Sequence, residues 1–153
     1  MTTADERRTD QPSDRRRAPR GGRRDTDAQG RHPTLLIADA DSGARRPCVR
    51  YLARHGFLVD EANGGDEATS AVEMVKPRLV LMDAALPAAR RFVPSVQAAG
   101  IPLIVMTTDF MDASAGDAAG RLVKPFPLDN MLAEVRRVLR LLDRQDAGGV
   151  GSA

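Results

Sequence analysis

Four polar side chains in this sequence stand directly at the ends of short apolar runs. The runs LLIA, LVLM, LIVM and LV lead into Asp39, Asp83, Thr107 and Lys124. Buried strands of a parallel sheet read as continuous Leu, Val and Ile stretches, because helices cover both faces. In such α/β sheets, ligands bind just outside the carboxyl ends of the strands. Two carboxylates, a hydroxyl and an ammonium group would therefore converge on one rim, and these groups suit phosphoryl chemistry.

The elements that must position these side chains alternate along the chain. Strands are predicted at residues 35–38, 57–62, 78–82, 101–106 and 121–123. Helices are predicted at residues 41–56, 66–75, 88–99 and 128–142. Pro47 lies inside the first helical pattern and predicts a kink there unless the helix starts late. Strands that alternate with helices indicate βαβ units, so the expected fold class is α/β with a doubly wound parallel sheet.

The two ends of the chain differ in composition from its middle. Residues 1–33 hold nine arginines and six acidic residues but no Leu, Ile, Val, Phe, Tyr or Trp. Such a segment cannot bury enough apolar surface to offset the entropy lost on ordering, so we expect a disordered Arg-rich tail. Residues 145–153 lack a core-forming pattern and are expected to be a flexible C-terminal tail. The folded domain is then predicted at residues 34–144.

Charge and cysteine content disfavour several classes of function. Nine arginines against six acids give the tail +3, whereas 14 basic against 15 acidic residues give the remainder −1. A weakly acidic domain disfavours a nucleic-acid partner. The single cysteine, Cys48, excludes an intramolecular disulfide and is expected to be a buried, inert thiol. The sequence shows neither a membrane span nor a signal peptide, so no membrane insertion and a cytoplasmic location are expected.

Five motifs in this order resemble the receiver domain of two-component response regulators. They are LLIADAD, EANGGDEA, RLVLMDAALP, IPLIVMTT and LVKPFPLDNML, and together they span about residues 35–142. The resemblance implies a flavodoxin-like, five-stranded parallel sheet. The segment 107–120 is short and rich in small polar residues, so the fourth helix should be weak or shortened. The few residues after Leu142 predict a stand-alone receiver without a fused output domain.

The resemblance also implies the roles of the rim residues. Asp83 would be the phosphoacceptor, because a carboxylate can form an aspartyl-phosphate. Lys124 would pair with the phosphoryl oxygens as a compact charge, and Thr107 would donate its hydroxyl to the phosphoryl group. The expected protein is not an enzyme, beyond catalysing its own phosphorylation and dephosphorylation.

A Mg²⁺ cofactor is the other implication of the resemblance. Asp39, Asp83 and the backbone carbonyl of Ala85 would bind the ion, with Asp41 as a further ligand or, like Ser42, as a helix N-cap. The family has two adjacent acids after the first strand, and the second binds the metal. This chain departs from that pattern, because its pair is Asp39 followed by Ala40, whose methyl group cannot coordinate a metal.

The predicted function is therefore that of a receiver module in a phosphorelay. Asp83 would accept a phosphoryl group from a histidine kinase or a phosphotransfer protein, and the output would pass to an unknown downstream protein. The alternative is a pseudo-receiver that binds proteins independently of phosphorylation. A nucleotide- or flavin-binding protein of the same architecture is disfavoured, because the first strand runs into Asp39 rather than a glycine-rich phosphate loop.

Overall fold

The computed structural model describes residues 34–109, 111 and 117–152. The predicted N-terminal tail, residues 1–33, lies outside the described residues, and the described domain begins at Thr34. The elements of this domain are β1 (Thr34–Ala38), α2 (Ser42–Arg54), β2 (Leu58–Ala62), α3 (Gly65–Val75), β3 (Leu79–Asp83), α4 (Ala89–Ala98), β4 (Leu103–Thr107), β5 (Gly120–Val123) and α5 (Leu128–Ser152).

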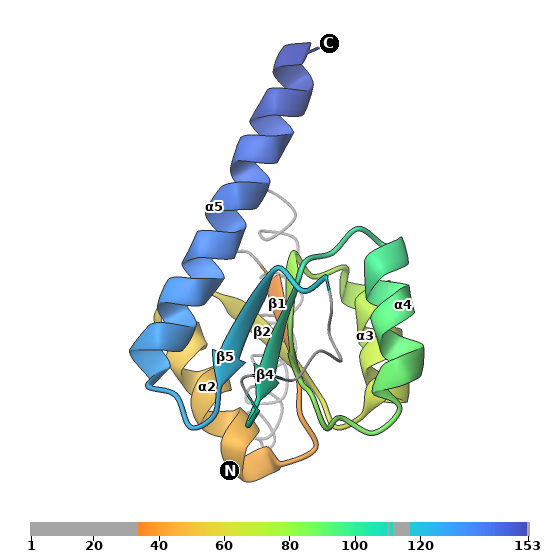
Figure 1. Ribbon diagram of the computed structural model, residues 1–153, viewed down its shortest axis with the longest axis vertical. Coiled ribbons are helices and arrows are strands. Elements are labelled where there is room, and N and C mark those ends of the chain that lie inside the picture. The colour runs from red at the N-terminus through yellow and green to blue at the C-terminus, as the bar shows by residue number, and fades with distance from the viewer. Residues whose placement is uncertain (1–33, 110, 112–116, 153) are drawn as a thin grey trace, which may run out of the picture. The chain divides into compact units, whose positions relative to one another are not determined.

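The five strands form one parallel sheet in the order β2-β1-β3-β4-β5. Helices α2 and α5 cover one face of this sheet, and α3 and α4 cover the other (Figure 1). Strand β2 lies on one side of β1, and β3 lies on the other side. The direction in which the chain adds strands to the sheet therefore reverses at β1. The predicted doubly wound, flavodoxin-like α/β fold is therefore confirmed.

The core lies in two layers, one on each face of the sheet. Because successive side chains of a strand point to opposite faces, every residue of a covered strand needs an apolar side chain. In β1, Leu35 and Ile37 pack towards α2 and α5, whereas Leu36 and Ala38 pack towards α3 and α4. This double burial is the physical reason why the three central strands β1, β3 and β4 contain uninterrupted apolar runs.

Helix α5 is longer than the sequence pattern predicts. We expected the helix to end at Leu142 and a flexible tail to begin at residue 145, but the helix continues to Ser152. In Figure 1 this extension runs past the sheet. Extending an existing helix adds one hydrogen bond for each residue ordered, so a formed helix can pass through residues of low propensity. Arg78 also pairs with Asp143 at 3.2 Å and Asp146 at 3.8 Å, which holds the start of the extension beside the domain.

The segment between β4 and β5 carries no helix among its described residues, which form turns or irregular backbone. Residues 110 and 112–116 lie outside the described part of the chain. The described domain accordingly contains four helices around the five strands, in line with the expected weak fourth helix. Within the described residues, none of the helices is both long and apolar enough to cross a membrane.

Candidate functional site

The carboxyl ends of four neighbouring strands bring the predicted site residues to one rim. Asp39 directly follows β1, Asp83 is the last residue of β3, Thr107 is the last of β4, and Lys124 directly follows β5. Parallel strands end at the same edge of a sheet, so residues separated by 85 positions in the chain come into contact there.

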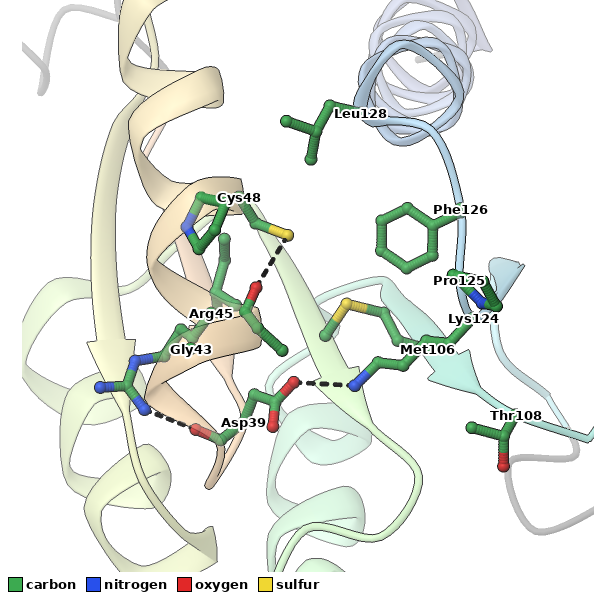
Figure 2. A pocket seen from close by; sticks show the side chains of 13 residues that line it. Asp39, Gly43, Arg45, Cys48, Met106, Thr108, Lys124, Pro125, Phe126 and Leu128 are labelled. Carbon is green, nitrogen blue, oxygen red and sulfur yellow. Dashed lines mark hydrogen bonds and ion pairs between the residues drawn. The ribbon is translucent and has the colours of Figure 1, made fainter.

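Lys124 bridges the two aspartates at the centre of this rim. Its Nζ donates to Asp39 Oδ2 at 2.9 Å and lies 2.8 Å from Asp83 Oδ1. Figure 2 shows the ammonium group facing the Asp39 carboxylate. Burial lowers the pKa of Lys124, but its hydrogen bonds to Asp83 and Asp39 outweigh that effect and raise the pKa above its ordinary value. The lysine is therefore charged at neutral pH and balances part of the negative charge of the two acids.

The carboxylate of Asp39 is buried and engaged on both oxygens. Its side chain is 4% exposed, Oδ2 accepts from Lys124, and Oδ1 accepts from the Asp41 backbone N–H at 2.9 Å. The backbone N–H of Asp39 donates to the Ala62 carbonyl at 3.0 Å, which links the residue to β2. A buried carboxylate of this kind needs such partners, because an unpaired buried charge is strongly unfavourable. Asp39 acts as a fixed charge, whereas Asp83 is the more accessible acid.

Asp83 presents its carboxylate to solvent while its neighbours hold the turn that follows. The side chain is 18% exposed, and Oδ2 accepts the Ala85 backbone N–H at 3.2 Å. The Asp83 carbonyl accepts the Leu86 N–H at 3.0 Å, and the Ala84 N–H donates to the Met106 carbonyl at 2.8 Å. Because the loop is held at these points, the carboxylate lies beside Lys124 and is open to an approaching group.

Thr107 joins the rim through its backbone. Its carbonyl accepts the Lys124 N–H at 2.7 Å, which ties β4 to the start of the loop after β5. Its hydroxyl donates to the Asp109 carbonyl at 3.2 Å and accepts the Asp109 N–H at 3.0 Å, so it closes a local turn. The predicted contact of this hydroxyl with a phosphoryl group is not tested by these hydrogen bonds and stays a prediction.

Asp41 caps helix α2, which is one of the two roles that the sequence left open for it. Its backbone is extended, and Oδ1 accepts the Gly43 N–H at 2.9 Å. The carbonyl of Asp41 also accepts the N–H of Arg45 at 2.9 Å, as expected for an N-cap. The helix begins at Ser42, so Pro47 lies within it and the alternative of a late start is wrong.

The cap predicts a modest effect of mutation. Asp41→Ala should lower the free energy of unfolding by about 1 kcal/mol, because it removes one acceptor from the first turn of α2. Urea unfolding would measure the loss, with the exposed neighbour Ser42→Ala as the control. A variant of unchanged stability whose Mg²⁺-dependent properties were lost would instead make Asp41 a metal ligand.

In the family's pattern the side chains at this rim coordinate Mg²⁺ directly. The side chains at the rim of this chain do not fit such coordination. Ala40 is exposed and offers no oxygen from its side chain, and Asp41 is used by the helix cap. Both oxygens of Asp39 already have donors. Among the described residues, no group of three or more His, Cys, Asp or Glu side chains is placed to hold a metal. Two carboxylates and the Ala85 carbonyl remain, and Lys124 lies between the carboxylates.

A pocket of about 430 Å³ adjoins Asp39 and Lys124 on the α2 side of the sheet. Part of its lining is apolar and includes Cys48, Met106, Phe126 and Leu128 (Figure 2). Burial raises the pKa of the Cys48 thiol, so the group is neutral at pH 7, and it lies 3.4 Å from the Ala44 carbonyl that it can donate to. The prediction of a buried cysteine is confirmed, whereas its inertness stays a prediction.

Arg45 is a site residue that the sequence did not reveal. The chain contains 21 arginines, and nothing in the local pattern separates this one from its exposed neighbour Arg46. In the structure Arg45 is 7% exposed, and its Nη1 donates to the Asp39 carbonyl at 2.6 Å. The only signal available in the sequence was position, because Arg45 lies in the first turn of the helix that follows Asp39.

Comparison with known proteins points to response regulators. No protein-family model matches the sequence. The response regulator MprA of Mycobacterium tuberculosis is 30% identical over 122 residues, which cover 74% of this chain and 53% of that protein. The DNA-binding response regulator MtrA of Mycolicibacterium paratuberculosis is 31% identical over 121 residues, which cover 74% of this chain and 54% of that protein. The chain thus spans about half the length of these relatives.

Solved structures share the fold at lower sequence identity. A CheY-like response regulator receiver domain protein from Methanospirillum hungatei has a TM-score of 0.68 and 20% identity, with 74% of this chain and 98% of that chain covered. The chemotaxis response regulator CheY4 of Vibrio cholerae has a TM-score of 0.63 and 24% identity, with 70% and 98% covered. The fold, the rim of Asp39, Asp83 and Lys124, and the similarity to response regulators together identify the domain that begins at Thr34 as a receiver domain of the response-regulator type.

Proposed function

We propose that this receiver domain accepts a phosphoryl group on Asp83 from a phosphohistidine of a histidine kinase or phosphotransfer protein. The observation that carries the proposal is the Asp83–Lys124 pair at the end of β3, where a partly exposed carboxylate lies 2.8 Å from an ammonium group. The similarity to response regulators supports the same role in a phosphorelay. The output would pass to a downstream protein that recognises the phosphorylated state.

The proposed step is an exchange of one bond to phosphorus for another. An Asp83 carboxylate oxygen attacks the phosphorus atom, and the bond between phosphorus and the imidazole nitrogen of the donor breaks. The imidazole leaves with the electron pair of that bond, and Asp83 becomes an aspartyl-phosphate. Catalysis of such a transfer depends mainly on positioning and on charge stabilisation. Here the positioning comes from the Ala85 and Leu86 backbone contacts of Asp83.

Lys124 supplies the positive charge that the reaction needs. The attacking carboxylate and the phosphoryl group are both anionic, so they repel each other unless a cation lies between them. The ammonium group already contacts Asp83 and can follow the phosphoryl oxygens, because a lysine has a flexible stem and three donors. The buried Asp39 holds the other side of this ammonium in place.

Intact mass spectrometry after incubation with acetyl phosphate tests this function. We expect one added phosphoryl group on the wild-type protein and none on Asp83→Ala, because that variant lacks the nucleophile. Asp66→Ala, which removes an exposed acid on α3, is the matched control and should be labelled like the wild type. Each protein is incubated with and without Mg²⁺. A phosphoryl group on Asp83→Ala would contradict the assignment of the phosphoacceptor.

A pseudo-receiver is the second candidate, and Ala40 is the observation that favours it. With this methyl group in place of the family's second acid, the rim has fewer oxygen donors, and Lys124 balances part of its negative charge within the protein. A domain of this kind would bind its partner through a surface that does not depend on phosphorylation. It predicts an unchanged mass for every protein in the experiment above, both with and without Mg²⁺.

A further inference from the structure

The buried guanidinium of Arg45 joins three segments at the rim. Its Nε donates to Glu61 Oε1 on β2 at 2.6 Å, and its Nη1 donates to Asn63 Oδ1 after β2 at 2.6 Å. Nη1 also donates to the backbone carbonyl of Asp39 at 2.6 Å (Figure 2). One side chain of α2 therefore connects the ends of β1 and β2 and the turn that follows β2.

These hydrogen bonds hold the guanidinium of Arg45 in one specific orientation. The Arg45 side chain is 8% exposed, and a buried charge persists only when it is paired and hydrogen-bonded. Its charged partner Glu61 is 39% exposed, so the pair reaches from the interior to the surface. The planar guanidinium directs its donors at fixed angles, which a lysine at the same place could not reproduce.

The consequence concerns Asp39, whose position determines the contact with Lys124. The backbone of Asp39 is held by the Ala62 carbonyl on one side and by Arg45 on the other, and its carboxylate contacts Lys124. If the Arg45 contact is lost, the Asp39 carbonyl has no donor from α2 and the end of β1 can shift. The hydrogen bond from Lys124 to Asp39 would then lengthen.

We infer that Arg45 is a positioning residue of the phosphoacceptor site, which fixes Asp39 against β2 and thereby fixes Lys124 between Asp39 and Asp83. Its effect on phosphorylation rests on the function proposed above, whereas its effect on Lys124 does not. The same contacts connect the start of α2 and the turn at Asn63 to the rim. A change at either place would alter the position of Lys124 without touching Asp83.

The test compares three variants of the full chain. Arg45→Met keeps the length of the side chain and removes its donors, Arg45→Lys keeps the charge, and Arg46→Met removes the exposed neighbouring arginine as the control. The first readout is the NMR chemical shift of the Lys124 Nζ atom at one neutral pH, which reports the contacts of this group and requires no phosphoryl group. The second is the rate of phosphorylation by acetyl phosphate.

We expect Arg45→Met to move the Lys124 Nζ resonance away from its wild-type position, because the hydrogen bond from Lys124 to Asp39 is weakened. The phosphorylation rate should fall on the order of 10- to 100-fold, as is usual when a reacting group is misplaced by a fraction of an ångström to an ångström. Arg45→Lys should restore neither property fully, because it cannot donate in two directions at fixed angles. Arg46→Met should match the wild type in both.

A folded Arg45→Met protein with the Lys124 Nζ resonance of the wild type would overturn the inference. If this variant does not fold, Asn63→Ala removes one acceptor of the same guanidinium and should move the Lys124 Nζ resonance in the same direction by a smaller amount. An unchanged resonance in Asn63→Ala would likewise overturn the inference. Absence of phosphorylation in the wild type, together with a moved Lys124 Nζ resonance in Arg45→Met, would contradict the proposed function and support the positioning role.

Discussion

Replacing Lys124 with methionine should both prevent phosphorylation of Asp83 and destabilise the domain by about 3 kcal/mol at pH 7. The loss of stability has a direct cause, because the buried carboxylate of Asp39 loses the cation that pairs with it. Asp83 then lies close to Asp39 without a charge between them. Urea unfolding and intact mass after acetyl phosphate treatment would measure the two effects. Lys76→Met, which replaces the other lysine of the chain at an exposed position, is the matched control.

The effect of Lys124 on stability should depend on pH in a defined direction. Its pKa is raised in the folded protein by hydrogen bonds that outweigh burial. The stability that it contributes is therefore fully present below the unfolded pKa, about 10.4, and is lost as the pH rises through the folded pKa. The difference in unfolding free energy between the wild type and Lys124→Met should accordingly shrink above that pH. A difference that stayed constant to higher pH would show that charge on Lys124 is not its source.

Ala40→Asp should increase the affinity for Mg²⁺ by at least about tenfold, because the affinity of hard cations depends on the number of charged oxygen ligands. Ala40 is exposed and follows Asp39, so the added carboxylate meets no steric barrier at the rim. Without the metal, a third carboxylate near Asp39 and Asp83 should lower the midpoint of thermal unfolding. Mg²⁺ should raise that midpoint again, because a ligand that binds only the folded state stabilises it.

The neutral isostere Ala40→Asn separates charge from shape in this experiment. Thermal unfolding with and without Mg²⁺ is measured for the wild type, Ala40→Asp and Ala40→Asn. We expect a clear rise of the midpoint with Mg²⁺ only in Ala40→Asp. An equal response of the two variants would show that the missing charge at residue 40 does not limit metal binding, and that the geometry of the surrounding loops does.

The strands and their common rim were predictable from local patterns. Each covered strand needs apolar side chains on both faces, so runs such as 79–82 stand out in the sequence. The polar residue after each run must then lie at the carboxyl edge, and Asp39, Asp83 and Lys124 do meet there. The length of α5 was not predictable in this way, because helix extension and the Arg78 ion pairs depend on the folded domain.

The contacts of the individual polar groups were not predictable. Asp41 is equally suited to a cap and to a metal ligand as an isolated residue, and its backbone conformation at the start of α2 makes it a cap. The hydroxyl of Thr107 makes hydrogen bonds with the backbone of Asp109 two residues later, and no local pattern in the sequence indicates these bonds. In the sequence, Arg45 cannot be told from a solvated helix arginine. Its acceptors, Glu61 and Asn63, come close to it only when β2 packs beside α2 in the folded domain.

The sequence by itself determined the fold class and the types of group at the rim, because hydrophobic runs, helix periods and their order are local properties of the chain. Only the tertiary structure decided which atoms these groups contact. Lys124 meets Asp39 and Asp83, and Arg45 meets Glu61 and Asn63, across separations in the chain that no local pattern spans. Their distances are set by the packing of the helices on the sheet, and it is these distances that determine how the charges of the site balance.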